Sequence, residues 1–164
     1  MIVVAVVPFG YVAVVFTERG VAACSLAERM PAAARAATAR SAAACRHRGR
    51  PAVPMTRLLR QLSDYLAGAP VRFDYPLDLE LVTPFRRRVM EATRRIPYGE
   101  VRSYGWVAKE IGQPGAAHAV GQALHRNPLP MIVPCHRAVG YDGALVGFGD
   151  GPNRRRRLLA LEGR

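Results

Sequence analysis

Residues 103–126 read SYGWVAKEIGQPGAAHAVGQALHR, and this stretch decides the fold of the second half of the chain. Ser103 can cap a helix over residues 104–111, which the sequence Gly112-Gln113-Pro114-Gly115 breaks. A second helix then extends over residues 116–126. Two helices joined by a short break that contains glycine are typical of a helix-turn-helix. The second half is therefore predicted to be mainly α-helical.

The second helix of this pair carries small side chains on the face that the core does not need. Such a face lets the backbone or a groove of a nucleic acid approach closely. It also suits tight packing against another helix. The residues alone leave both interpretations open.

Another helix is predicted upstream, where Thr83 can act as the cap and Pro84 occupies the first helical position. Its expected buried stripe consists of Phe85, Val89, Met90, Ala92 and Ile96. The segment before this helix, residues 78–83, marks a boundary. We therefore expect two domains, residues 1–80 and residues 81–164.

The first domain is predicted to be a small antiparallel sheet with a helix. Apolar, β-branched runs at residues 2–7, 11–16 and 21–24 are separated by turns, and leucines at helical spacing follow at residues 56–66. Residues 71–75 alternate like a further strand. Cys24 is expected to lie in the core of this sheet.

Between these elements, residues 31–53 are rich in Ala and Arg and poor in large apolar side chains. The alanines favour a helix, but no side chain here is expected to anchor it to a core. The segment is therefore predicted to be an exposed helix or a mobile loop.

The charge of the chain predicts a polyanionic partner. Its 164 residues include 24 Lys and Arg but only 12 Asp and Glu, which gives a formal net charge of +12. A GC-rich genome, which raises both Arg and Ala, is the alternative explanation of this excess.

Cysteine usage and hydropathy narrow the class of protein further. The three cysteines form neither a CxxC pair nor a zinc-ligand pattern, so we expect a reducing cytoplasm and no metal site. The apolar run at residues 1–7 is too short for a signal peptide, and none approaches the roughly 20 residues that a membrane span needs.

The sequence Ile132-Val133-Pro134-Cys135-His136-Arg137 places a thiol beside an imidazole, before a glycine-rich loop at residues 139–151. A thiolate is a good nucleophile, and a histidine polarised by a carboxylate can supply the base. Glu162, at the end of an apolar helix, is the candidate carboxylate. Adjacent side chains in a strand face opposite ways, so coupling needs a bend or a bridging water. A buried structural cysteine beside a surface histidine is the alternative.

From residue 83 to residue 163 the sequence resembles the O6-alkylguanine-DNA alkyltransferase family, the suicide repair proteins for alkylated guanine. The matching pieces occur in family order and spacing. They are Pro97-Tyr98-Gly99-Glu100-Val101-Arg102-Ser103-Tyr104-Gly105, Ala119-Val120-Gly121, Asn127-Pro128, Ile132 to Arg137, Gly147-Phe148-Gly149-Asp150-Gly151, and Leu158-Leu159-Ala160-Leu161-Glu162-Gly163. The resemblance implies a winged-helix-like alkyltransferase domain behind a variable α/β domain.

The resemblance also implies a role for each matching residue. Cys135 would accept the alkyl group, His136 would take its proton through a water, and Glu162 would orient His136. Asn127 would brace the turn before the active-site strand, and Tyr104 would donate a proton toward guanine N3. The implied substrate-binding residues are Pro130, Ala138, Phe148 and Gly149. The implied DNA-binding residues are Ala117, His118, Ala119, Gly121, Gln122 and Arg126.

The family's chemistry implies no metal or organic cofactor and a partner that is double-stranded DNA with alkylated guanine, with O4-alkylthymine as a second substrate. We expect a cytoplasmic, nucleoid-associated monomer. The sequence departs from the family at His118, where an arginine is usual, and at Ala138, where valine or isoleucine is usual. Two other functions compete with alkyl transfer: lesion binding without transfer, whose proteins lack the acceptor cysteine, and transcription regulation through the helix-turn-helix.

Overall fold

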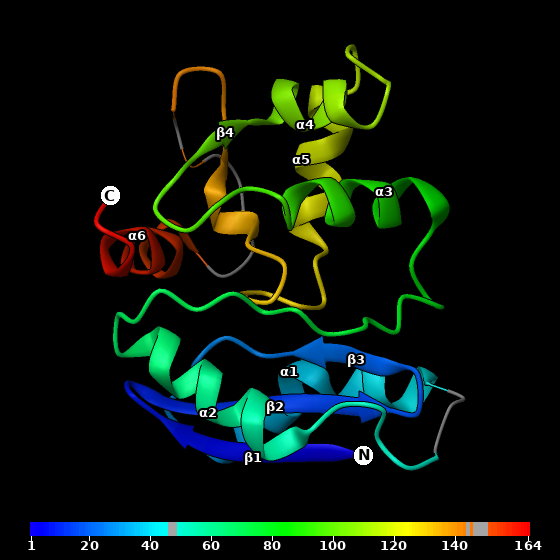
Figure 1. The fold of residues 1–164 in the computed structure, drawn as a ribbon, viewed down its shortest axis with the longest axis vertical. Coiled ribbons are helices and arrows are strands. Elements are labelled where there is room, and N and C mark those ends of the chain that lie inside the picture. Colours follow the sequence, from blue (N-terminus) through cyan, green and yellow to red (C-terminus); the bar gives the residue numbers. More distant parts are fainter. Residues whose placement is uncertain (46–48, 144, 146–150) are drawn as a thin grey trace. The chain divides into compact units, whose positions relative to one another are not determined.

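The structure, a computed structural model, describes residues 1–45, 49–143, 145 and 151–164 (Figure 1). The chain divides into two compact units. The first comprises residues 1–81 and 128–132, and the second comprises residues 82–127 and 133–164. Within the described ranges, no helix is long and apolar enough to cross a membrane.

The first unit is built on an antiparallel sheet with the strand order β1-β2-β3. Its strands are β1 (Ile2–Val7), β2 (Gly10–Thr17) and β3 (Gly20–Cys24), so the predicted strands are confirmed. Gly20, with φ at +145°, opens β3 where a Cβ atom would lie 2.1 Å from the carbonyl oxygen of Pro76. Only glycine fits this turn.

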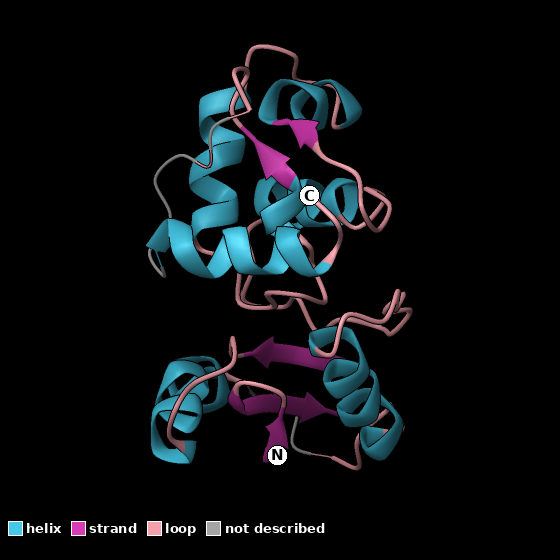
Figure 2. Ribbon diagram, turned by 90° about the vertical axis from the view of Figure 1, so that its left-hand side faces the viewer, coloured by secondary structure: helices cyan, strands magenta, loops and turns pink. Residues whose placement is uncertain are grey.

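Helices α1 (Pro31–Ala44) and α2 (Met55–Leu66) cover opposite faces of this sheet (Figures 1 and 2). This arrangement explains why β2 is buried on both faces from its third residue onward. Ala34 and Thr38 of α1 are fully buried. The expectation that nothing in residues 31–53 anchors a helix is therefore wrong, because small side chains let α1 approach the sheet closely.

The strand predicted at residues 71–75 does not form, and this segment is extended without strand pairing in the described structure. Phe73 and Tyr75 are nevertheless buried. The ring of Phe73 meets that of Tyr65 on α2 edge to face, with the centroids 5.7 Å apart. The alternation thus reflects side chains packed on a helix and not a sheet register.

The second unit is mainly helical, and both predicted caps are present. Its elements are α3 (Pro84–Thr93), α4 (Tyr104–Glu110), α5 (Ala117–His125), α6 (Gly151–Leu161), and the parallel pair β4 (Arg102–Ser103) and β5 (Ala138–Val139). The hydroxyl of Thr83 accepts from the backbone N–H of Arg86, and that of Ser103 accepts from Trp106. Helices α4 and α5 form the predicted helix-turn-helix. These two helices share a buried core with α3, which includes Val89, Ala92, Ile96, Val107, Ala108, Val120, Ala123 and Leu124.

Residues 128–132, which follow α5 in the chain, belong to the first unit. The backbone N–H of Cys24 donates to the carbonyl of Pro128 at 2.8 Å. Leu129 and Met131 are fully buried, and Met131 has a positive φ of 70°. A bulky residue with positive φ is unusual, so the burial of this side chain outweighs the backbone preference.

Candidate active site

Cys135 begins the short 3-10 helix η1 (Cys135–Arg137), which β5 follows directly. Cys135 therefore lies in a turn and not in the active-site strand that the resemblance implied, and this turn is the bend that the sequence left as an alternative. The N–H of Cys135 donates to the carbonyl of Val133 at 2.7 Å, and that of Arg137 donates to Pro134 at 2.9 Å. These bonds curl the chain, so neighbouring side chains no longer alternate between two faces. Cys135 is half-buried against the core of α3, α4 and α5.

Glu162 joins the two residues that follow Cys135. One carboxylate oxygen, Oε1, lies 2.8 Å from Nε2 of His136, and the other, Oε2, lies 2.9 Å from Nε of Arg137. The carboxylate also accepts from the backbone N–H of Gly99 at 3.1 Å. All three side chains of this network are buried. A buried carboxylate with this many donors is stable as the anion.

The surroundings of His136 determine its charge, and the carboxylate determines which ring nitrogen carries the hydrogen. Burial lowers the pKa of His136, the Glu162 hydrogen bond and charge act in the opposite direction, and Arg137 and Arg155 add to the lowering. The imidazole is therefore neutral at pH 7. A carboxylate can only accept, so Nε2 carries the hydrogen and the lone pair lies on Nδ1. Nδ1 is then the nitrogen that can act as a base.

Arg137 has a structural role that the sequence did not reveal. Its guanidinium forms a fork with Glu162 and also donates from Nη1 to the carbonyl of Ile96 at 2.8 Å. The paired fork balances the negative charge of the carboxylate without transferring a proton to it. The only signal in the sequence was an arginine next to His136, in a chain where arginines are common.

Tyr104 opens α4 and is half-buried against the same core. Burial raises the pKa of Tyr104, while the charge and the side-chain hydrogen bond of Arg155 oppose this change. The guanidinium of Arg155 therefore lies near the hydroxyl of Tyr104.

Arg155 of α6 is a second residue that the sequence did not single out. Its Nη2 donates to the carbonyl of Ala138 at 3.0 Å and also to the carbonyl of Cys135. One buried guanidinium thus holds both ends of η1 and contacts Tyr104. Four consecutive arginines at residues 154–157 hid this position, because the run suggests a solvated helix face.

Asn127 and Ala138 flank this centre. The side-chain Nδ2 of Asn127 donates to the carbonyl of Val133 at 3.0 Å, two residues before Cys135. Ala138 is fully buried in β5. Pro130 belongs to the first unit. Phe148 and Gly149 lie outside the described residues.

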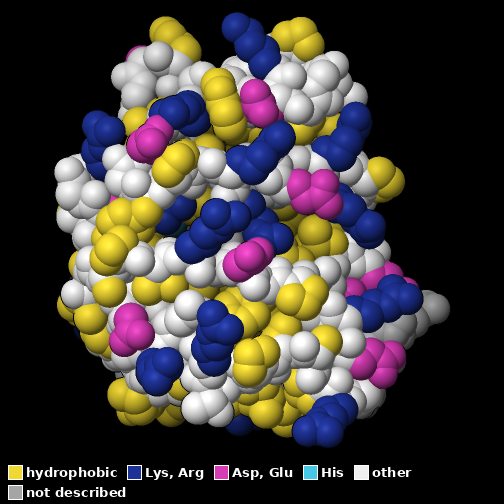
Figure 3. Space-filling view, in the orientation of Figure 1, with side chains coloured by type: hydrophobic (Ala, Val, Ile, Leu, Met, Phe, Trp, Pro, Cys, Tyr) yellow, Lys and Arg dark blue, Asp and Glu magenta, His cyan; other side chains and the backbone are white. Residues whose placement is uncertain are grey.

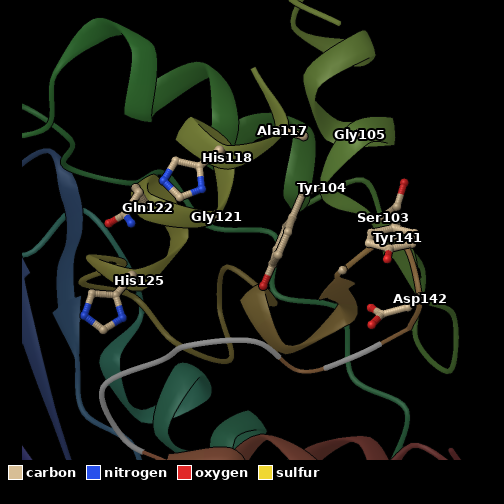
Figure 4. Close-up of a pocket in the computed structure, with 11 residues that line it drawn as sticks. Ser103, Tyr104, Gly105, Ala117, His118, Gly121, Gln122, His125, Tyr141 and Asp142 are labelled. Atoms are coloured by element: carbon tan, nitrogen blue, oxygen red, sulfur yellow. The ribbon is translucent and has the colours of Figure 1, made fainter. Parts of the chain in front are cut away.

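A pocket of about 550 Å³ lies beside α5 (Figure 4). Of the predicted DNA-binding residues, Ala117, His118, Gly121 and Gln122 line it, and Ala119 and Arg126 do not. Tyr104, the predicted proton donor, and Ser103, the predicted helix cap, also line it. Its remaining lining residues, which were not among the predicted site residues, are Gly105, His125, Gly140, Tyr141 and Asp142. A Cβ atom on Gly121 would lie 3.6 Å from the Tyr104 ring, so α5 passes close to that ring.

The basic side chains do not gather into one patch on the face drawn in Figure 3. Lys and Arg are spread over that face, with Asp and Glu between them. That face therefore shows no single basic patch to which the net charge of +12 can be assigned.

Comparison with known proteins places this geometry in a family. Residues 84–164 match the model of the DNA binding domain of 6-O-methylguanine DNA methyltransferase. A methylated-DNA--protein-cysteine methyltransferase of Mycobacterium bovis is 55% identical over 102 residues, which cover 62% of this chain and 61% of the relative. One of Salmonella typhimurium is 43% identical over 121 residues, 72% of this chain and 71% of the relative.

Solved structures give the same result over nearly the whole chain. The crystal structure of Mycobacterium tuberculosis OGT in complex with DNA has a TM-score of 0.76 and 38% identity, and the match covers 97% of this chain and 90% of that one. The O6-methylguanine-DNA methyltransferase of Pyrococcus kodakaraensis has a TM-score of 0.70 and 25% identity, with coverage of 99% and 98%.

Proposed function

Because this chain belongs to the 6-O-methylguanine DNA methyltransferase family, we propose that it repairs DNA by irreversible transfer of an alkyl group from O6-alkylguanine to Sγ of Cys135. The observation that carries the proposal is a half-buried thiol at Cys135, followed directly by His136, which is buried and paired with Glu162. O4-alkylthymine is a second candidate substrate.

The first step generates the nucleophile. The thiol proton of Cys135 passes through a bridging water to Nδ1 of His136, and the thiolate attacks the alkyl carbon. The new S–C bond forms as the C–O6 bond breaks. Glu162, 2.8 Å from His136, stabilises the imidazolium that results. Since Glu162 is already paired with Arg137, it stays ionised throughout.

The second requirement is a good leaving group. The electron pair of the broken C–O6 bond moves into the purine ring, and the hydroxyl of Tyr104 donates a proton to N3. The raised pKa of Tyr104 supports this role, because the hydroxyl then keeps its proton at neutral pH. The thioether product is stable in water, so each molecule reacts once.

A base inside a duplex is out of reach, so the target nucleotide has to be extruded. We propose that α5 makes the DNA contact with Ala117, His118, Ala119, Gly121, Gln122 and Arg126. Pro130, Ala138, Phe148 and Gly149 would bind the extruded base. Asn127 would hold the backbone before Cys135 through its bond to Val133.

We also propose a domain organisation, an oligomeric state and a location for this protein. Residues 1–80 would be the variable α/β domain and residues 81–164 the DNA-binding alkyltransferase domain. The protein would act as a cytoplasmic, nucleoid-associated monomer on double-stranded DNA. Its DNA affinity should fall steeply with salt, because phosphate contacts release counterions.

The test is to incubate the protein with a duplex oligonucleotide that carries O6-methylguanine, and then to weigh the Cys135 peptide. A gain of one methyl group that is lost in Cys135→Ala and kept in Cys24→Ala supports transfer. Tight and selective binding of the lesion without a gain in mass would instead indicate a lesion-binding protein. Methylation at Cys24 or Cys45 would contradict the assignment of the acceptor.

A further inference from the structure

Tyr141 is 98% exposed, whereas the other exposed aromatic side chain among the described residues, Phe9, is 47% exposed. It lies in a turn directly after β5, in which the N–H of Gly143 donates to the carbonyl of Gly140 at 3.1 Å. Gly143 has a positive φ of 78°, so glycine favours this turn. The turn presents a large flat ring to solvent, and exposed aromatic surface often marks a binding site.

The ring stands at the pocket beside α5 and not at an arbitrary place on the surface. Figure 4 shows His118 and Gln122 on one side of this pocket, Tyr141 and Asp142 on the other, and Tyr104 between them. The pocket volume of about 550 Å³ is large enough for a nucleobase. The exposed ring and the proposed DNA-contacting face of α5 thus border one space.

Resting on the proposed function, we propose that Tyr141 is a base-stacking residue that holds the duplex at the lesion. Extrusion of a nucleotide breaks the stacking of its neighbours. An aromatic ring beside the pocket replaces part of that contact, because any base can stack on it whatever the sequence. The imidazole of His118 borders the same pocket from α5, so the two rings act from opposite sides.

The neighbouring charge favours a base over a phosphate as the partner of Tyr141. Asp142 follows Tyr141 in the turn and lines the same side of the pocket. A phosphate bound at the Tyr141 hydroxyl would meet this like charge. A base carries no net charge and presents a flat face, so it avoids the repulsion and uses the whole ring.

The test compares two variants on two substrates. Tyr141→Ser removes the ring, and Tyr141→Phe keeps the ring but removes the hydroxyl. Each variant is given duplex DNA with O6-methylguanine and, separately, the free base O6-benzylguanine, and alkylation of Cys135 is followed by mass. We expect Y141S to react about tenfold more slowly on the duplex and at the wild-type rate with the free base. Y141F should match the wild type on both.

Three results would overturn the inference. Y141S could react with the duplex at the wild-type rate, Y141S and Y141F could lose the same fraction of the duplex rate, or Y141S could react more slowly than the wild type with the free base. Failure of the proposed function looks different, since the wild type would then gain no alkyl group from either substrate. In that case, duplex affinity measured by fluorescence anisotropy tests the stacking role by itself. The inference requires Y141S to bind the duplex about tenfold more weakly than Y141F.

Discussion

Cys24 and Cys135 are the same residue type in two different surroundings. Cys24 ends β3 in the first unit, where burial raises its pKa to about 12 and its Sγ donates to the neighbouring carbonyl of Ser25. Cys135 is half-buried and opens a 3-10 turn that also carries a buried, neutral histidine. The difference predicts that Cys135 is the more reactive of the two thiols, because access and the surrounding polar groups control cysteine reactivity.

The two units also use buried polar groups differently. In the first unit the buried carboxylate of Asp78 accepts a hydrogen bond from the hydroxyl of Thr17 at 2.8 Å, which stabilises a turn next to the sheet. In the second unit Glu162 binds both an imidazole and a guanidinium. The first arrangement satisfies one carboxylate, whereas the second holds a candidate base in one tautomer. The two buried carboxylates therefore differ in that Glu162 alone of this pair contacts a group that can act as a base.

The largest expected effect is a difference in thiol alkylation. At pH 7.5 iodoacetamide should label Cys135 on the order of a thousandfold faster than Cys24, because the thiolate of a buried cysteine with a high pKa is scarce. Peptide mass mapping over time gives both rates in one sample. In guanidinium the rates should become equal. Equal rates in the native protein would contradict the contrast between the two thiols.

The next effect concerns the stability of the second unit. Glu162→Gln should lower the free energy of unfolding by about 3 kcal/mol, because it leaves the buried guanidinium of Arg137 without its counter-charge. Glu110→Gln is the matched control. It removes a similar ion pair with Arg95, at 3.1 Å but exposed, and should change stability by less than about 1 kcal/mol. Urea unfolding measures both changes. Equal losses would contradict the claim that the buried pair of Glu162 and Arg137 contributes more to stability than the exposed pair.

A smaller effect is expected from pH. The pKa of His136 is lowered in the folded state, mainly by burial, below the unfolded value of about 6.5. Between the two values the unfolded chain binds a proton that the folded chain does not. The free energy of unfolding therefore carries no penalty from His136 above pH 6.5. It falls as the pH drops from 6.5 to the lower folded-state pKa, by at most about 1.4 kcal/mol per pH unit.

His136→Asn should remove this part of the pH dependence. The groups that act on the imidazole are Glu162, Arg137 and Arg155, and the variant leaves all three in place. Urea titrations at several pH values between 5 and 7.5 supply the measurement. If the slope were unchanged in His136→Asn, other groups would be responsible for it.

Much of this structure could be predicted from local sequence patterns. The three strands, the amphipathic helix α2, the caps at Thr83 and Ser103, and the helix-turn-helix follow from periodicity and turn residues. The failures have tertiary causes. Residues 71–75 alternate because Phe73 packs on α2, and α1 is anchored by Ala34 and Thr38, which are too small to stand out in a sequence.

At the candidate site, sequence alone identified the residues with reactive groups but missed those that hold them. Cys135, His136 and Glu162 stood out by chemistry and by resemblance. Arg137 and Arg155 did not, because an arginine in a chain with 24 basic residues gives no sign of burial. Their roles depend on contacts between segments far apart in the chain, such as the bond from Arg137 to the carbonyl of Ile96.

The smallest expected effect is at His118, which is exposed on α5 and lines the pocket. His118→Arg should preserve the rate of methyl transfer from duplex DNA or raise it by up to about tenfold, because arginine is longer, always charged and can add one charged hydrogen bond. His125→Arg is the matched control, since it adds the same charge two turns along the same pocket wall. A gain confined to His118→Arg would show that reach at this position limits repair. Equal gains in both variants would assign the effect to net charge, and should then disappear at high salt. A marked loss in His118→Arg alone would mean that the imidazole itself is suited to its place opposite Tyr141, and would contradict the view of His118 as a weakened contact.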